Sequence, residues 1–176
     1  MKNKDMSVEL NTKTFLFELN PKSNEEAWEL KYFDADCGKY KKVASNEPLD
    51  IPFVLDKLEG ISDKAYRALI SRQQAVIIVE MKDKKHADWR FWQNGISLTS
   101  EQDEQDYTLN AQVQNQGKTL VLTINNVLSN AALCEGEFDR IDFRFVAVKL
   151  NESAGQLNEI FYSQDPRVGV RRNKPA

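Results

Sequence analysis

The run Trp89-Arg90-Phe91-Trp92 is the stretch of the sequence best suited to ligand binding. Successive side chains of a β-strand point to opposite faces, so Arg90 and Trp92 would share one face and the other two aromatic rings the opposite face. An exposed guanidinium beside an indole ring could stack a sugar ring or a base. The alternative, which we favour, is structural: Trp92 packs under a helix, and Arg90 stacks on it or pairs with an acidic residue.

Four carboxylates lie within six residues in the segment 101–106, which reads Glu-Gln-Asp-Glu-Gln-Asp. Ca²⁺ prefers carboxylate oxygens, and Asp103, Glu104 and Asp106 are the ligands we expect if this segment binds a cation. A charged loop is also the ordinary way to solvate a turn. The segment is therefore a candidate metal site with a solvated turn as its alternative.

The motifs of the common enzyme classes are missing from the sequence. The single histidine, His86, lies among lysines and aspartates, which is typical of a solvated turn. Asp34 and Asp36, ahead of Gly38, resemble the opening of a calcium loop, but the later ligands of such a loop are missing. No zinc pattern, phosphate-binding loop, dinucleotide glycine pattern or nucleophile elbow is present. We therefore expect no catalytic residue, no cofactor and a protein that is not an enzyme.

Charge and hydropathy limit the kinds of partner and the cellular compartment that we expect for this chain. The 176 residues carry 24 Lys and Arg against 27 Asp and Glu, with a formal net charge of −3. A nucleic-acid-binding surface needs a basic face, so we expect no nucleic-acid partner. The sequence has no apolar stretch long enough to cross a bilayer, and residues 1–10 lack the apolar run of a signal peptide. We expect a cytoplasmic protein without membrane contact.

Period-two alternation recurs along the chain and predicts strands rather than helices. In 138–150 it places Ile141, Phe143, Phe145 and Ala147 on one face. The only good helix is expected at 63–73, with Ser62 as its N-cap. Strands are expected at 14–19, 28–33, 40–44, 51–55, 75–81, 107–114, 119–127, 138–150 and 160–163.

Two further patterns concern the middle of the chain. Asn94-Gly95 separates apolar segments at 88–93 and 96–99 and predicts a β-hairpin, because both turn residues can adopt positive φ. The β-branched run in 75–81 predicts a strand that is buried on both faces. The fold class that follows is mostly β: an antiparallel two-sheet β-sandwich, immunoglobulin-like, with one short helix. We divide the chain into a flexible N-terminus, 1–10, a single sandwich domain, 11–166, and a basic C-terminal tail, 167–176.

The C-terminal half of the chain carries a family resemblance. Its segments read DFRFVAVKL at 142–150, QLNEIFYS at 156–163 and QDPRVGV at 164–170. This order, an aromatic-rich strand pair followed by Asp-Pro and a short apolar run, looks like the ending of the AidA/PixA inclusion-body proteins. The DP-EP family of small bacterial β-sandwiches shares a similar Asp-Pro ending. Either resemblance implies a bacterial, cytoplasmic sandwich without established catalytic residues.

The leading functional hypothesis is a non-enzymatic β-sandwich that self-associates, as a homo-oligomer, or binds another protein. Exposed sheet edges and aromatic-rich strands make such assembly easy. The alternative is a small-ligand module for a carbohydrate, a nucleotide or a cation, which would use Arg90 and Trp92 or the acidic segment 101–106.

Overall fold

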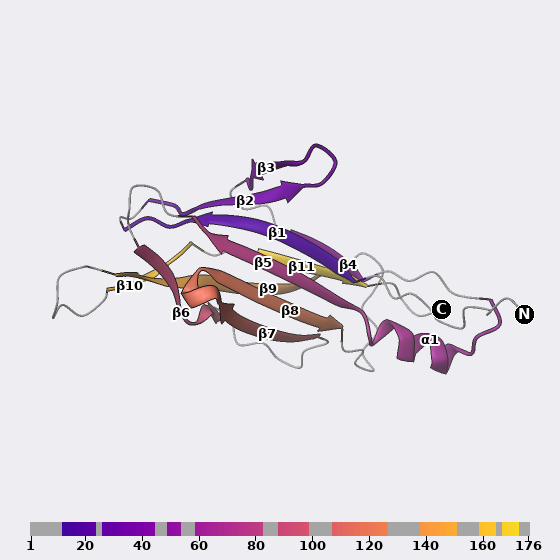
Figure 1. Cartoon of the computed structure of the whole chain (residues 1–176). Coiled ribbons are helices and arrows are strands. Elements are labelled where there is room, and N and C mark those ends of the chain that lie inside the picture. Colours follow the sequence, from indigo (N-terminus) through magenta and orange to yellow (C-terminus); the bar gives the residue numbers. More distant parts are fainter. Residues whose placement is uncertain are drawn as a thin grey trace, which may run out of the picture.

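The described part of the chain folds into two β-sheets packed face to face, with one α-helix at the end of the sandwich (Figure 1). The computed structural model describes residues 12–23, 26–44, 49–53, 59–82, 88–98, 107–126, 138–150, 159–164 and 167–172. The predicted mostly-β class, two sheets and single short helix are confirmed. The expected flexible N-terminus, 1–10, lies outside the described residues.

The larger sheet has six strands, and its central pair is parallel. β1 runs alongside β5 in the same direction, while the other neighbours in this sheet are antiparallel. The expectation of purely antiparallel sheets was therefore wrong, because alternation predicts which face a residue occupies but not the direction of its neighbour. The strand order is β3 (Lys39–Lys42), β2 (Glu29–Asp34), β1 (Lys13–Asn20), β5 (Gln74–Met81), β8 (Thr119–Asn126) and β7 (Tyr107–Gln114).

The smaller sheet is built around the long strand β9, Phe138–Leu150. Its order is β10 (Ile160–Tyr162), β9, β11 (Arg167–Arg172) and β4 (Leu49–Phe53), and β6 (Asp88–Leu98) pairs with β9 as well. β11 and β4 form a second parallel pair. Residues 167–172, expected in a basic tail, are thus a strand, since their backbone pairs with both β9 and β4.

One apolar core fills the space between the sheets. Its members alternate along the strands, as period two requires, and come from β1, β5, β6, β8 and β9. The predicted inward face of β9 is confirmed by the burial of its four residues, Ile141, Phe143, Phe145 and Ala147. Trp89 on β6 meets Trp28 and Phe161 edge-on, at centroid distances of 6.0 and 5.0 Å, and so joins the two layers.

β6 is a single strand with a bulge, not the expected hairpin. Phe91 pairs with Ala147 and Ile96 with Phe145, so β6 advances five residues while β9 advances two, which leaves three extra residues in the bulge. The positive φ expected at the glycine is present, 81° at Gly95. A Cβ there would lie 2.9 Å from Leu120 Cδ1, so the bulge presses glycine backbone onto the larger sheet.

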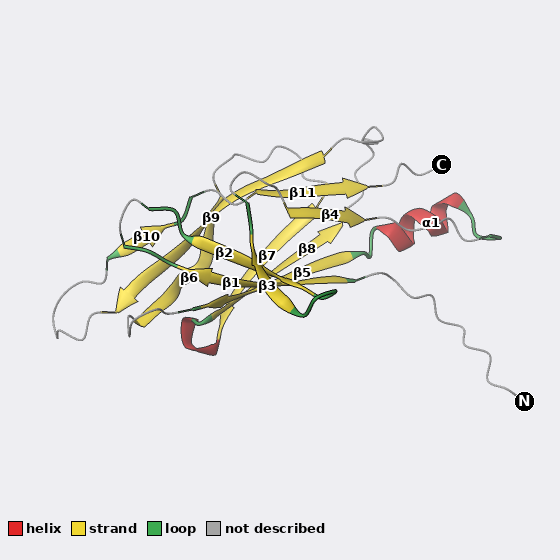
Figure 2. Cartoon of the chain, turned by 90° about the horizontal axis from the view of Figure 1, so that it is seen from above, coloured by secondary structure: helices red, strands yellow, loops and turns green. Residues whose placement is uncertain are grey.

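The helix α1, Asp63–Ile70, lies beyond the ends of the strands in both views (Figures 1 and 2). The predicted cap is confirmed: Ser62 Oγ accepts a hydrogen bond of 3.2 Å from the Ala65 amide. Tyr66 is the buried residue that anchors this short helix. In the described part of the chain, no helix has the length and apolar character needed to cross a membrane.

Candidate functional site

The predicted ligand-binding pair, Arg90 and Trp92, lies on the outward side of β6. Trp89 and Phe91 are buried, whereas Arg90 is half-buried and Trp92 is 38% exposed, so the alternation in this run is confirmed. The expected packing of Trp92 under the helix does not occur, because β6 and α1 lie at opposite ends of the molecule in both views (Figures 1 and 2).

Arg90 takes the acidic partner that the structural alternative expected. Its Nη2 and Nε donate to the two carboxylate oxygens of Asp88, at 2.9 and 3.3 Å. Lys118 Nζ lies 2.9 Å from the same carboxylate and donates to the Trp89 carbonyl at 2.7 Å. Hydrogen bonding first from Arg90 and then from Lys118 lowers the pKa of Asp88 below its usual range.

This cluster joins the two sheets at the turn between β7 and β8. That turn contains the 3-10 helix η1, Asn115–Gly117, in which Gly117 has a φ of 88°. A Cβ on Gly117 would lie only 2.8 Å from the Arg90 Cβ, so the stem of the arginine rests on glycine backbone. We call Asp88, Trp89, Arg90, Gly117 and Lys118 the β6 junction. Its geometry is that of a structural contact between the two sheets, in which the Arg90 guanidinium is already hydrogen-bonded to Asp88.

Trp92 belongs to a second set of side chains, on the outer face of the smaller sheet. Val146 and Val148 point away from the core, between inward-facing neighbours, yet are only 6% and 3% exposed. On β10, Tyr162 pairs with Val146 and is 55% exposed, and Ile160 pairs with Val148 and is 42% exposed. We call Trp92, Ile160 and Tyr162, with the two valines, the Trp92 patch. It offers two exposed aromatic rings on either side of a buried aliphatic strand.

The larger sheet presents a more extensive exposed set that the sequence patterns did not predict. Residues from five adjacent strands share its outer face and line up across the sheet. Register pairs Tyr40 with Phe33, Leu16 with Ile78, and Ile78 with Val121; one further step of the β1–β2 register brings Leu16 beside Phe33. Leu16 is 37% exposed, and Phe33 and Tyr40 are each 36% exposed. We call Leu16, Phe33, Tyr40, Ile78 and Val121 the apolar row.

The rings of Phe33 and Tyr40 form the ordered end of this row. They meet edge-on at a centroid distance of 5.3 Å, as cross-strand aromatic pairs prefer. Partial burial raises the pKa of Tyr40, and the charges of Glu18 and Glu80 raise it further, against the opposing charge of Lys82.

A row of charged residues runs beside the apolar row, two residues away along each strand. Register places Lys42 against Lys31, Lys31 against Glu18, and Glu18 against Glu80. The basic residues lie on β3 and β2, and the acidic residues lie on β1 and β5. Lys82 reaches both carboxylates, at 2.8 Å from Glu80 and 3.5 Å from Glu18. We call Glu18, Lys31, Lys42 and Glu80 the charged row.

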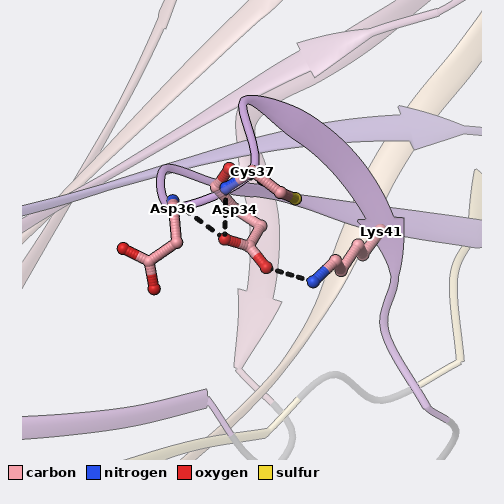
Figure 3. A network of polar contacts seen from close by, with 4 residues as sticks. All are labelled: Asp34, Asp36, Cys37 and Lys41. Atoms are coloured by element: carbon pink, nitrogen blue, oxygen red, sulfur yellow. Dashed lines mark hydrogen bonds and ion pairs between the residues drawn. The ribbon is translucent and has the colours of Figure 1, made fainter.

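The turn between β2 and β3 contains the acidic pair that resembled a calcium loop (Figure 3). The Asp34 carboxylate accepts hydrogen bonds from the Asp36 and Cys37 amides, at 3.0 and 3.3 Å, and pairs with Lys41. The bond from Lys41 is the largest cause that lowers the pKa of Asp34. Gly38, at a φ of 65°, closes the turn. Asp34 therefore holds the turn together, and its two oxygens are both in use.

The predicted metal ligands Asp103, Glu104 and Asp106 lie outside the described residues, as does His86. Among the residues that are described, no three or more His, Cys, Asp or Glu side chains form a group able to hold a metal ion. The cation site in 101–106 stays a prediction.

Comparison with known proteins gives the chain a family. No curated protein matches it. The model of the DP-EP family matches residues 2–172, so the similarity extends well beyond the C-terminal half in which the resemblance was recognised. The AidA/PixA resemblance is not confirmed. Because this match covers nearly the whole chain, the chain belongs to the DP-EP family.

Proposed function

We propose that this chain is a protein-binding module, and that the outer face of the larger sheet is its binding surface. The observation that carries the proposal is the apolar row, in which a leucine and two aromatic residues are each more than a third exposed beside two half-buried aliphatic residues. Contiguous exposed apolar groups rimmed by charge mark interaction sites in soluble proteins. Aromatic side chains dominate the energetics of such interfaces.

The edge of the same sheet favours binding through the face. β3 is a four-residue edge strand that reads Lys-Tyr-Lys-Lys, and all four side chains are exposed. Lysines on a short edge strand oppose the addition of another strand. A partner is therefore expected to cover the pleated surface, where Phe33 and Leu16 lie, rather than to extend the sheet at β3.

Photo-cross-linking in cells that express the chain tests the proposal. Phe33 is replaced by p-benzoylphenylalanine, and the matched control carries the same group in place of Lys64, an exposed position on α1, away from this face. We expect a covalent adduct with a protein from position 33 and little from position 64. No adduct from position 33, or equal yields from both, would contradict the proposal.

A second candidate function is a small-ligand module at the Trp92 patch. The observation that favours it is the exposure of Trp92 and Tyr162 on either side of Val146. Aromatic faces of this kind stack sugars and bases. A ligand that binds only the folded chain raises its melting temperature. We expect a thermal-shift screen of sugars and nucleotides to find a stabilising compound whose effect is lost in Trp92→Ala; a screen without any shift removes this candidate.

A further inference from the structure

We infer that the partner of the outer face is a second copy of this chain, packed face to face about a two-fold axis that runs along the strands between β1 and β2. The inference rests on the proposed function, because it names the occupant of the same surface. It is carried by the self-complementarity of the apolar row and of the charged row.

The apolar row matches itself under this operation. A two-fold axis between β1 and β2 places β2 of one copy over β1 of the other, and β3 over β5. Phe33 then lies over Leu16 of the second copy, and Tyr40 lies over Ile78. Each contact joins an aromatic ring to an aliphatic side chain, and each occurs twice, as an isologous interface requires. Packed sheets keep their strand directions within about 30°, so the pairs nearest the axis stay in register.

The charged row selects this axis over its neighbours. With the axis between β1 and β2, Lys31 of one copy faces Glu18 of the other, and Lys42 faces Glu80. An axis shifted by half the spacing between strands, so that it runs along β1 itself, would place Glu18 of one copy over Glu18 of the other. Like charges in an interface cost several kcal/mol, whereas opposite charges fix register and speed encounter. The division of the row into a basic half and an acidic half therefore fits a second copy placed about the first axis.

The extent of the surface sets the strength expected of the dimer. Four strands at about 4.8 Å spacing, each contributing about four residues at about 3.3 Å, give a patch of roughly 250 Å² on each copy. Stable interfaces bury about 800 Å² per partner. We therefore expect a dimer at the weak end of specific association, which forms and dissociates with protein concentration.

A charge-swap experiment tests the arrangement on the full chain. One variant carries Lys31→Glu with Lys42→Glu, and the other carries Glu18→Lys with Glu80→Lys. The control carries Gln112→Glu with Gln114→Glu, two exposed positions on β7 outside the proposed contact. Each sample is followed by sedimentation equilibrium, with circular dichroism melting to show that it folds.

We expect the native chain and the control to form a dimer that depends on protein concentration. Each swapped variant alone should dimerise at least tenfold more weakly. Mixing the two swapped variants should restore the affinity of the dimer. Folded swapped variants that dimerise as the native chain does would overturn the arrangement. A native chain that stays monomeric throughout would overturn the choice of a second copy, and a cross-link from position 33 to another protein would then still support the proposed function.

Discussion

The outer face of the larger sheet and the β6 junction both combine aromatic rings with ion pairs. The contacts of the junction connect the two sheets, whereas those of the face lie within one sheet. At the junction, Trp89 is buried among rings from both sheets, and Lys118 bridges to β6 from 29 positions along the chain. On the face, Phe33 and Leu16 are exposed, and the ion pair between Lys82 and Glu18 beside them stays within the larger sheet. The junction therefore ties the two sheets together, whereas the face leaves exposed the apolar groups on which the proposed association depends. Substitutions at the junction should therefore lower the stability of the fold, whereas substitutions on the face should weaken association.

The largest expected effect is at the centre of the junction. Trp89→Ala removes a buried ring that packs edge-on against Trp28 and Phe161, and we expect it to lower the free energy of unfolding by about 3–5 kcal/mol. Trp92→Ala is the matched control, because the same side chain three positions further along is 38% exposed and buries less apolar area, so its cost should be about 1–2 kcal/mol. Urea unfolding at equilibrium measures both. Equal costs would show that Trp89 does not join the sheets as described.

A smaller effect is expected where the junction rests on glycine. In Gly117→Ala, positive φ costs about 1–2 kcal/mol, and the overpacking against Arg90 adds about 1–3 kcal/mol. In Gly38→Ala only the first cost applies, since the space around Gly38 is open. Denaturant unfolding of the two variants should thus differ by the overpacking cost. A Gly38→Ala variant as unstable as Gly117→Ala would contradict the close approach of η1 to β6.

The ion pairs of the junction predict a modest dependence on pH. The pKa of Asp88 is lowered in the folded chain, so its contribution is present above the unfolded value of about 3.9 and is lost as the pH falls through the folded value. The carboxylate is 42% exposed, and solvent screening holds the effect below about 1 kcal/mol. Asp88→Asn should therefore be slightly less stable than the native chain at pH 7 and equal to it near pH 2. A gap that persists at low pH would point to packing rather than charge.

Much of the fold could be predicted from alternation, because a strand with one face in the core shows its pattern locally. The strand 138–150 and its four inward residues are as expected, and so is the outward side of Arg90 and Trp92. What failed depended on partners far along the chain. Asn94-Gly95 signals positive φ, but whether it makes a turn or a bulge is decided by its pairing with β9. The strand 167–172 likewise exists through β9 and β4.

The candidate surface was missed for a related reason. The run Val76-Ile-Ile-Val79 predicted burial on both faces of β5, yet only Ile77 and Val79 are buried, and Val76 and Ile78 are half-exposed on the outer face. An apolar run indicates that both faces avoid water; it does not say whether the cover comes from the same chain. A useful signal would have been that Leu16, Phe33, Val76 and Ile78 are all apolar at outward positions of three predicted strands, where polar side chains are the ordinary choice.

The most direct test of the face-to-face dimer is the mass of Leu16→Lys compared with that of the native chain. The substitution places a charge in the middle of the apolar row, on an exposed position where the cost to folding should stay within about 0.5 kcal/mol. Sedimentation equilibrium should show the native chain rising from 20.2 kDa toward twice that mass as the concentration increases. Leu16→Lys should keep the mass of a single chain at every concentration while unfolding at the same urea midpoint. Equal association of the two proteins would contradict a dimer that forms through the apolar row.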